Sequence, residues 1–157
     1  MADKTTQNPI QYLTGQKSKK PSPCTCLNMR RSSNALTDVY DRYLASCSVT
    51  VSQYSILRHI IYLAPVSVSD LSVALRLDRT TLVRNLRPLE QKKWIEDIAE
   101  EGTRNRQLQL TELGRQVFAC ADERWEQAQA DITKHLGDED AAKLAELLEK
   151  IEQYQGH

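Results

Sequence analysis

One segment, residues 78–110, constrains the fold most, because its apolar spacing changes from a helical period to a strand period. Asp78 has the short polar side chain that is favoured at a helix N-cap. The leucines at positions 82, 86 and 89 then lie on one face of a helix. After them the spacing predicts strands at 94–98 and 106–110, the second with clean polar–apolar alternation. The segment therefore predicts an amphipathic helix followed by a β-hairpin.

The face of this helix that points away from the leucines carries hydroxyl, amide and guanidinium groups. It holds Thr80, Arg84, Arg87 and Gln91, and it is flanked by Arg79, Thr81 and Asn85. These donors suit base edges in the major groove and backbone phosphates, although any solvated helix also has a polar face. The hairpin tip adds Arg104, whose guanidinium suits a narrow minor groove.

Amphipathic helices are also predicted before this segment. Apolar side chains recur at helical spacing over 24–44 and again up to Pro65, which stops a helix because it has no N–H group. Ser67 then predicts the N-cap of a short helix, with Asp70 three positions on. The N-terminus of that helix is suited to phosphate, with Ser67 and Ser69 as the contacting hydroxyls.

Two more helices are predicted after the hairpin. Thr111 predicts the N-cap of a long helix that Gly137 ends, and Asp138 starts the last helix. The predicted elements follow the order of a winged helix-turn-helix with helical extensions: helix, helix, short helix, turn, polar helix, hairpin, long helix and helix. The predicted fold is mainly α with a small β-hairpin wing.

Two stretches of sequence resemble the MarR family of bacterial regulators. The first covers 68–71, 77–86 and 89–90, and the second covers 104–114, which ends in the family's apolar–x–Leu–Thr–x–x–Gly pattern. Two positions depart from the family. Gly102 stands where the wing has an Asp that braces its Arg, and Pro88 lies inside the recognition helix, where it predicts a kink.

The resemblance implies a homodimer that represses transcription from a pseudo-palindromic operator and is released by a ligand or an oxidant. The long apolar stripe of the helix after the hairpin fits this, since it needs a partner to cover it. The implied parts are a flexible arm (1–23), a helical dimerisation region (24–48 and 111–157) and a DNA-binding lobe (49–110). The residues expected to contact DNA are Ser67, Ser69, Arg79, Thr80, Thr81, Arg84, Asn85, Arg87 and Arg104.

Cysteines are one candidate for the effector site. Cys24 and Cys26 lie at the start of the first helix beside two arginines, an environment that favours thiolates. Some relatives in the resembled family sense oxidants with an N-terminal cysteine. Cys47 is a candidate resolving partner, and Cys120 is predicted to lie in the core. The alternative is that all four are inert thiols.

A small aromatic or phenolic ligand is the other effector hypothesis that the resemblance implies. Its pocket would lie between the dimerisation region and the DNA-binding lobe. The side chains that could line it are Tyr40, Tyr43, Arg58, His59 and Tyr62. Ordinary core and interface packing of these side chains is the competing interpretation.

Composition narrows the class of protein. The 157 residues hold 21 basic and 21 acidic side chains, but residues 79–93 have five basic against one acidic, and 112–157 have five against eleven. Residues 1–31 have six basic against one acidic, so positive charge is concentrated in the N-terminal arm and on the polar helix. No apolar run reaches the roughly 20 residues of a membrane span, and residues 1–20 lack the apolar core of a secretory signal. We therefore expect a cytoplasmic protein whose cysteines are thiols.

Nothing in the sequence predicts an enzyme, a metal site or a cofactor. There is no phosphate-binding loop, dinucleotide glycine pattern or nucleophile elbow, and the three histidines lack metal-ligand spacing. The alternative function is a winged-helix protein-interaction module, which the acidic C-terminal part would suit. Cations on both the polar helix and the hairpin favour DNA, because a protein-binding wing has no need of them.

Overall fold

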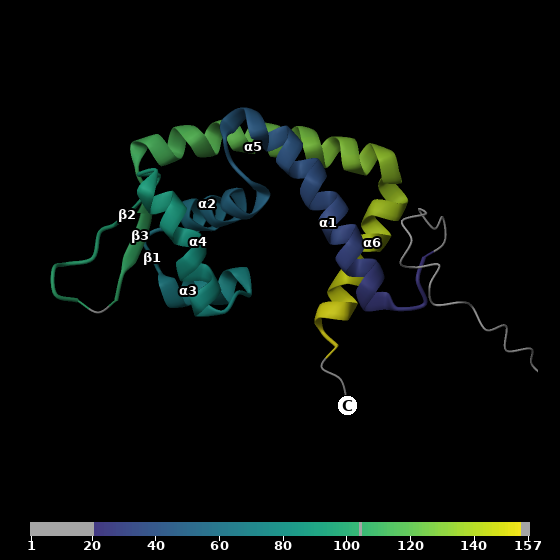
Figure 1. The fold of residues 1–157 in the computed structure, drawn as a ribbon, viewed down its shortest axis with the longest axis horizontal. Coiled ribbons are helices and arrows are strands. Elements are labelled where there is room, and N and C mark those ends of the chain that lie inside the picture. The colour runs from purple at the N-terminus through teal and green to yellow at the C-terminus, as the bar shows by residue number, and fades with distance from the viewer. Residues whose placement is uncertain (1–20, 104, 155–157) are drawn as a thin grey trace, which may run out of the picture. The chain divides into compact units, whose positions relative to one another are not determined.

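The computed structural model describes residues 21–103 and 105–154. By its internal contacts the chain divides into two units, Met1–Leu36 and Thr37–His157. The elements, in chain order, are α1 (Thr25–Leu44), the 3₁₀ turn η2 (Ala45–Cys47), α2 (Val51–Leu63), β1 (Val66–Ser67), α3 (Val68–Leu75), α4 (Arg79–Gln91), β2 (Ile95–Asp97), β3 (Gln107–Leu110), α5 (Glu112–Leu136) and α6 (Asp138–Glu152). The expected order of a winged helix-turn-helix is confirmed (Figure 1).

Short polar side chains set the starts of α2, α3, α4 and α5. The side chains of Ser67, Asp78 and Thr111 each accept a hydrogen bond from a backbone N–H three residues on, as predicted. Thr50 does the same for α2 and forms a complete capping box with Gln53. Pro65 follows the end of α2, also as predicted. Local chemistry therefore accounts for four helix starts and one stop.

The core lies where α2, α3, α4, the sheet and the first half of α5 meet. Leu82, Leu86 and Leu89 of α4 are completely buried there, beside Leu57 of α2 and Leu108 of β3. This confirms the predicted inward face of α4. The opposite face of the same helix is left to solvent, which positions the candidate site.

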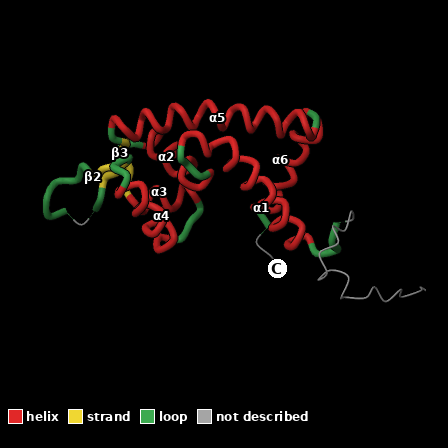
Figure 2. Tube along the Cα trace, turned by 45° about the horizontal axis from the view of Figure 1, so that its top comes forward, coloured by secondary structure: helices red, strands yellow, loops and turns green. Residues whose placement is uncertain are grey.

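The wing is a three-stranded antiparallel sheet rather than the predicted two-stranded hairpin. The strand order is β1-β3-β2, with Val66 of β1 opposite Leu108 and Ile95 of β2 opposite Leu110. All four of these side chains are buried. Figure 2 shows the strands together beside α2, and β3 also packs against α5. A strand of two residues has no measurable alternation, so the sequence did not predict β1.

Gly137 separates α5 from α6, as expected, and its φ of +86° is one that glycine adopts without strain. α5 buries Gly114, Phe118, Ala121 and Ala128, whereas Leu113, predicted on its apolar stripe, is 47% exposed. α6 buries no side chain, although four of its apolar residues share one stripe. These four are Leu144, Leu147, Leu148 and Ile151.

The expectation of four free thiols is wrong. Cys47 and Cys120 form a disulfide, with their Cα atoms 6.1 Å apart and 73 residues between them in sequence. Cys120, predicted to lie in the core, is exposed, because its side chain points toward η2 and away from the buried face of α5. Cys24 and Cys26 are free and exposed. Among the described helices, none is long and apolar enough to cross a membrane.

Candidate nucleic-acid interface

The N-terminal end of α4 is fixed by Asp78. Its carboxylate accepts hydrogen bonds from the backbone N–H of Thr81, at 2.9 Å, and from the Thr81 hydroxyl. These hydrogen bonds hold the pKa of Asp78 below its ordinary value. The Thr81 hydroxyl is thus engaged in capping, which leaves the exposed Thr80 as the freer donor at this end of the helix.

The outward face of α4 carries the predicted cations. Arg84 and Arg87 are exposed one turn apart, and Asn85 beside them is half-buried. Within the described part of the chain, neither arginine forms a salt bridge or a side-chain hydrogen bond, so both guanidinium groups are available. The helix continues through Pro88 to Gln91, so the proline does not end it. This face presents several donors in one direction, which a groove of DNA can accept.

The turn between α3 and α4 is tied to both helices. Arg79 donates a hydrogen bond from Nη1 to Oγ of Ser69, at 2.9 Å, which joins two predicted contact residues across the turn. Ser67 is occupied as the N-cap of α3 and donates to Asp70. Arg76 has a positive φ in this turn and forms an exposed ion pair with Glu152 of α6. Of these, Arg79 and Ser69 face solvent and are accessible to phosphate.

Arg106 braces the wing against α4, a role that the sequence analysis missed. Its guanidinium pairs with Glu90 of α4 and, at 3.0 Å, with Asp97 of β2. Burial disfavours the ionised form of Asp97, but hydrogen bonds from the Gln107 and Ala99 N–H groups and from Arg106 outweigh it, so the pKa of Asp97 lies below its ordinary value. The only sequence signal was an acidic residue, Glu90, within a basic segment.

The tip of the wing explains one departure from the family pattern. Gly102 has a φ of +87° in a turn where Thr103 donates to the Glu100 carbonyl. An Asp at this position would be strained, since side-chain-bearing residues rarely adopt such a φ. Arg104, the predicted minor-groove residue, lies outside the described residues. Bracing of the wing comes from Arg106 at its base.

Lys92 and Trp94 connect the end of α4 to two neighbouring segments. The Lys92 ammonium lies 4.2 Å from the centre of the Trp94 ring and donates to the Ser48 carbonyl at 3.3 Å. Trp94 is buried, and its carbonyl lies so close to Gly114 that a Cβ atom there would overlap it. The end of α4 therefore contacts the linker that precedes α2 and the start of α5.

The five residues predicted to line a ligand pocket lie on α1 and α2. Arg58 packs its guanidinium over Trp125, at 4.6 Å from the ring centre, and over the exposed Tyr62. It also pairs with Asp122 at 3.2 Å and donates to Tyr54. His59 contacts the Ser55 carbonyl within its own helix. Arg58 and Tyr62 thus come together, but His59 does not join them.

A shallow cavity of about 640 Å³, largely open to solvent, lies along α5 and the start of α6. Trp125, Gln129 and Thr133 contribute to its lining. The hydroxyl of Tyr40 donates to Gln129, and burial raises the pKa of Tyr40. Tyr43 is hydrogen-bonded to Asp131, which raises its pKa as well. Two of the predicted effector residues therefore contact the lining of this cavity, Tyr40 through Gln129 and Arg58 through Trp125.

The described residues contain no cluster of three or more histidine, cysteine or carboxylate side chains that could hold a metal ion.

Cys24 directly precedes α1, and Cys26 lies in its first turn. The Cys24 N–H donates to the Ser22 hydroxyl, and the Cys24 carbonyl accepts from Asn28. Both thiols are exposed and open to reagents.

A helix-turn-helix whose second helix shows an outward basic face, followed by a three-stranded wing, defines a winged helix-turn-helix protein. The MarR family profile matches residues 48–104. The M. tuberculosis transcriptional regulator MosR in complex with DNA is 30% identical, with a TM-score of 0.66 over 82% of this chain and 98% of that one. The chain belongs to the MarR family, whose members are non-enzymatic DNA-binding regulators.

Two further structures share the fold. The transcriptional repressor CouR, bound to a 23-mer DNA duplex, has a TM-score of 0.76 at 20% identity, over 83% of this chain and 93% of that one. A mutant MarR from E. coli complexed with operator DNA has a TM-score of 0.74 at 22% identity, over 92% and 99%. No curated protein sequence matches the chain.

Proposed function

We propose that the protein is a homodimeric transcriptional repressor that binds a pseudo-palindromic DNA operator. The observation that carries the proposal is the exposure of Arg84 and Arg87, neither of which pairs with a described residue, on a helix whose opposite face is held in the core by three buried leucines. Thr80 and Asn85 extend the same face toward base edges. The braced wing beside it would place Arg104 at the adjacent minor groove. The MosR, CouR and MarR structures, each with DNA, support this use of the fold.

The backbone phosphates are assigned to residues at the turn. Ser67, Ser69, Arg79 and Thr81 lie at the N-terminal ends of α3 and α4, where backbone N–H groups and the helix dipole favour an anion. Ser67 and Thr81 would act mainly through the helix starts that they form, because their hydroxyls already have partners. Ser69 and Arg79 are free to turn toward phosphate.

Dimerisation is proposed for the segments 24–48 and 111–157, and DNA binding for 49–110. The apolar stripe of α6 is exposed in the single chain, and burying one leucine side chain contributes about 1.5–3 kcal/mol. A second copy would cover this stripe and set the spacing of two recognition helices near one turn of DNA. A regulator of this kind acts where the DNA is, so the proposal includes a cytoplasmic location.

Release of DNA is proposed to follow from an aromatic or phenolic ligand or from cysteine oxidation. The Arg58 cluster offers a guanidinium between aromatic rings, which suits an aromatic acid. Tyr40 and Tyr43 lie on α1, and His59 lies on α2 with Arg58 and Tyr62. CouR is also known bound to p-coumaroyl-CoA, and MarR from E. coli in an oxidised form. Cys24 and Cys26 are accessible thiols for the second route.

The proposed function is tested by fluorescence anisotropy with a labelled duplex from upstream of the protein's own gene, at two salt concentrations. We expect binding that weakens steeply with salt, because phosphate contacts release counterions. Arg84→Ala should weaken binding by about 1–3 kcal/mol. Arg115→Ala removes an exposed arginine of α5 and is the matched control, which should bind like the wild type.

Two results would contradict this proposal. One is an Arg84→Ala variant that binds the duplex as tightly as the wild type at fixed salt. The other is an absence of binding to the upstream duplex and to a random pool of duplexes, which would favour the alternative of a protein-interaction module.

A further inference from the structure

The disulfide joins two segments that would otherwise touch only through side-chain packing. Cys47 ends the 3₁₀ turn η2, which connects α1 to α2, and Cys120 lies in the first half of α5. η2 itself buries no residue, whereas Leu44 before it and Val49 after it are buried. The disulfide therefore adds a covalent anchor to a short linker between two fixed points.

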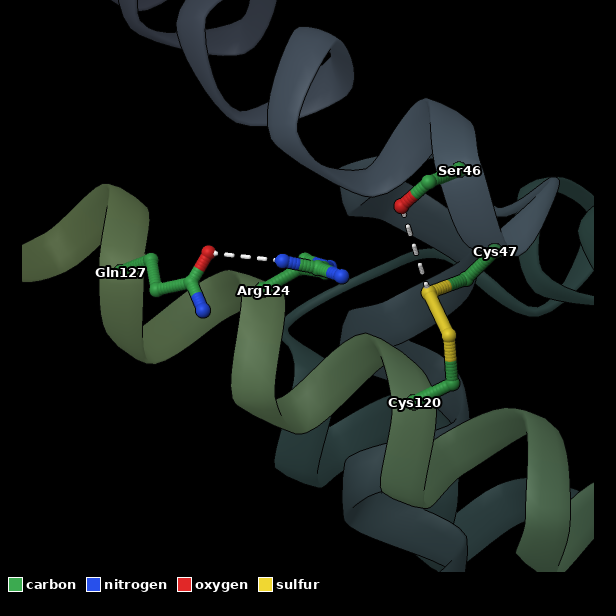
Figure 3. Close-up of a disulfide and its surroundings, with 5 residues drawn as sticks. All are labelled: Ser46, Cys47, Cys120, Arg124 and Gln127. Carbon is green, nitrogen blue, oxygen red and sulfur yellow. Dashed lines mark hydrogen bonds between the residues drawn. A yellow bond between two sulfur atoms is a disulfide. The ribbon is translucent and has the colours of Figure 1, made fainter.

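The disulfide is open to small molecules in solution. Cys120 is exposed and Cys47 is half-buried. Figure 3 shows polar neighbours on both sides: the Ser46 hydroxyl lies 3.8 Å from the Cys47 sulfur, and Arg124, one turn beyond Cys120, donates to Gln127. A disulfide in this setting is reached by reductants and, once reduced, by oxidants. Disulfides in reducing compartments are mostly transient and redox-active.

The linker is connected to the recognition helix by a direct contact. The carbonyl of Ser48, next to Cys47, accepts the hydrogen bond from Lys92 at the C-terminal end of α4. On its far side the linker meets α1, since Asp41 accepts from the Val51 N–H at 2.6 Å. Anchoring Cys47 to α5 thus restrains the acceptor of this exposed hydrogen bond from the end of α4.

We propose that Cys47 and Cys120 are a reversible redox couple, oxidised by a hydroperoxide, whose state sets the freedom of the linker and of the C-terminal end of α4. The proposal rests on the proposed function for its effect on DNA, but not for the couple itself. The oxidised protein, as in this structure, is the form with the lower DNA affinity. Reduction frees the linker and lets α4 adjust to the groove.

The chemistry balances with a hydroperoxide as oxidant. The more exposed thiol, Cys120, attacks the outer peroxide oxygen as its thiolate, the O–O bond breaks, and an alcohol leaves with one proton. The Cys47 sulfur then attacks the resulting sulfenic acid, forms the S–S bond and releases water. Two thiols lose two electrons and two protons, and the peroxide gains them. A dithiol reverses the step by exchange.

The couple is tested first without DNA. Reduced protein is treated with cumene hydroperoxide, the remaining thiols are alkylated, and peptides are mapped by mass spectrometry. We expect a Cys47–Cys120 crosslink that dithiothreitol removes. Hydrogen exchange should be faster after reduction in two segments, 45–50 and 89–94, and unchanged elsewhere. A crosslink through Cys24 or Cys26 instead, or equal exchange in both states, overturns the proposal.

The effect on DNA is then measured with the same labelled upstream duplex. We expect oxidation to weaken wild-type binding about tenfold, a typical allosteric coupling, and reduction to restore it. The double variant Cys47→Ser/Cys120→Ser should bind equally with and without peroxide. The variant Cys24→Ser/Cys26→Ser removes the other two thiols proposed for the oxidation route. We expect it to keep the full response, which assigns that route to Cys47 and Cys120, whereas a lost response overturns this assignment. Lys92→Gln should keep the crosslink but lose most of the change in affinity.

The outcomes separate the two proposals. A response that persists in Cys47→Ser/Cys120→Ser overturns the redox assignment and leaves DNA binding intact. Binding that is identical in both redox states, despite the mapped crosslink, overturns the coupling. No binding in either state removes the proposed function, while the mapping and the exchange data still decide whether the couple exists and frees the linker.

Discussion

At Gly114 a single hydrogen atom in place of a side chain lets α5 begin directly against the wing. The Trp94 carbonyl occupies the space that a Cβ atom would need, and it also accepts hydrogen bonds from the backbone N–H and hydroxyl of Thr111. The Lys92 ammonium in turn lies over the Trp94 ring in a cation–π contact. One residue with no side chain thus controls how closely α4, the wing and α5 approach.

The first prediction concerns this contact. Gly114→Ala should lower the free energy of unfolding by about 1–3 kcal/mol, because the added methyl group must displace backbone rather than a flexible side chain. Urea unfolding followed by circular dichroism measures the loss. Gly102→Ala, at a tip position with open space but a positive φ, is the comparison and should cost about 1 kcal/mol or less. Equal effects would argue against the close approach.

A second prediction at this scale concerns pH. Because the pKa of Asp97 is lowered by folding, its ionised form stabilises the native state above its ordinary value of 3.8, and this contribution is lost as the pH falls through the lower folded value. Asp97→Asn should therefore be less stable than the wild type near neutral pH. The difference should shrink below about pH 4. Urea unfolding of both proteins across this range tests it, and a constant difference would contradict it.

Among the elements, the wing depends on more than its own strands. Arg106 of the wing pairs with Glu90 of α4, so the angle between wing and recognition helix is fixed by side chains at the base of the sheet. Both groups are about one third exposed, so the pair contributes little to global stability. Its effect is on how much freedom the wing has before DNA is bound.

The third prediction separates the effect of the Arg106–Glu90 pair on stability from its effect on DNA binding. Arg106→Gln should lower stability by less than about 1 kcal/mol. It should weaken DNA binding roughly five- to tenfold, because the wing must then be ordered on binding. Anisotropy and urea unfolding measure the two effects. Lys143→Gln, which breaks an exposed ion pair with Glu146 on α6, is the control and should leave DNA binding unchanged. A loss of stability that matches the loss of affinity would refute a positioning role.

Sequence reasoning succeeded for elements whose cause is local and failed where the cause is a distant partner. The caps at Ser67, Asp78 and Thr111 need only residues within one turn, and the inward leucines of α4 need only helical spacing. β1 exists because β3, about forty residues later, offers it a pairing edge. A two-residue strand carries no period of its own from which it could be predicted.

The same limit applies to the site. The outward face of α4 could be predicted, because it is the complement of a leucine stripe. The brace at Arg106 and the disulfide between Cys47 and Cys120 could not, since each joins residues that only the tertiary fold brings together. The expectation of free thiols came from the compartment alone.

For the whole molecule, the unpartnered stripe on α6 leads to the fourth prediction. Leu147→Asp should raise the dissociation constant of the proposed dimer at least a hundredfold, because each copy loses a buried leucine worth about 1.5–3 kcal/mol. Analytical ultracentrifugation measures the change. Val73→Asp replaces a more exposed apolar residue, on α3, and should leave the assembly unchanged. A wild type that sediments as a monomer would refute the dimer.

The central position of β3 has a consequence for how such a protein can change. β3 is hydrogen-bonded on one side to β1, which leads directly into α3, and on the other side to β2. The wing is therefore attached through β3 to the helix-turn-helix. In the described part of the stretch that joins β2 to β3, Ile98 still donates to the Gln107 carbonyl, but residues 99–103 take no part in either pairing. Insertions or deletions there would change how far the wing extends along a DNA groove without disturbing the core. The length of the tip can therefore vary, in evolution or by design, and change which DNA sequences are bound while the fold stays the same.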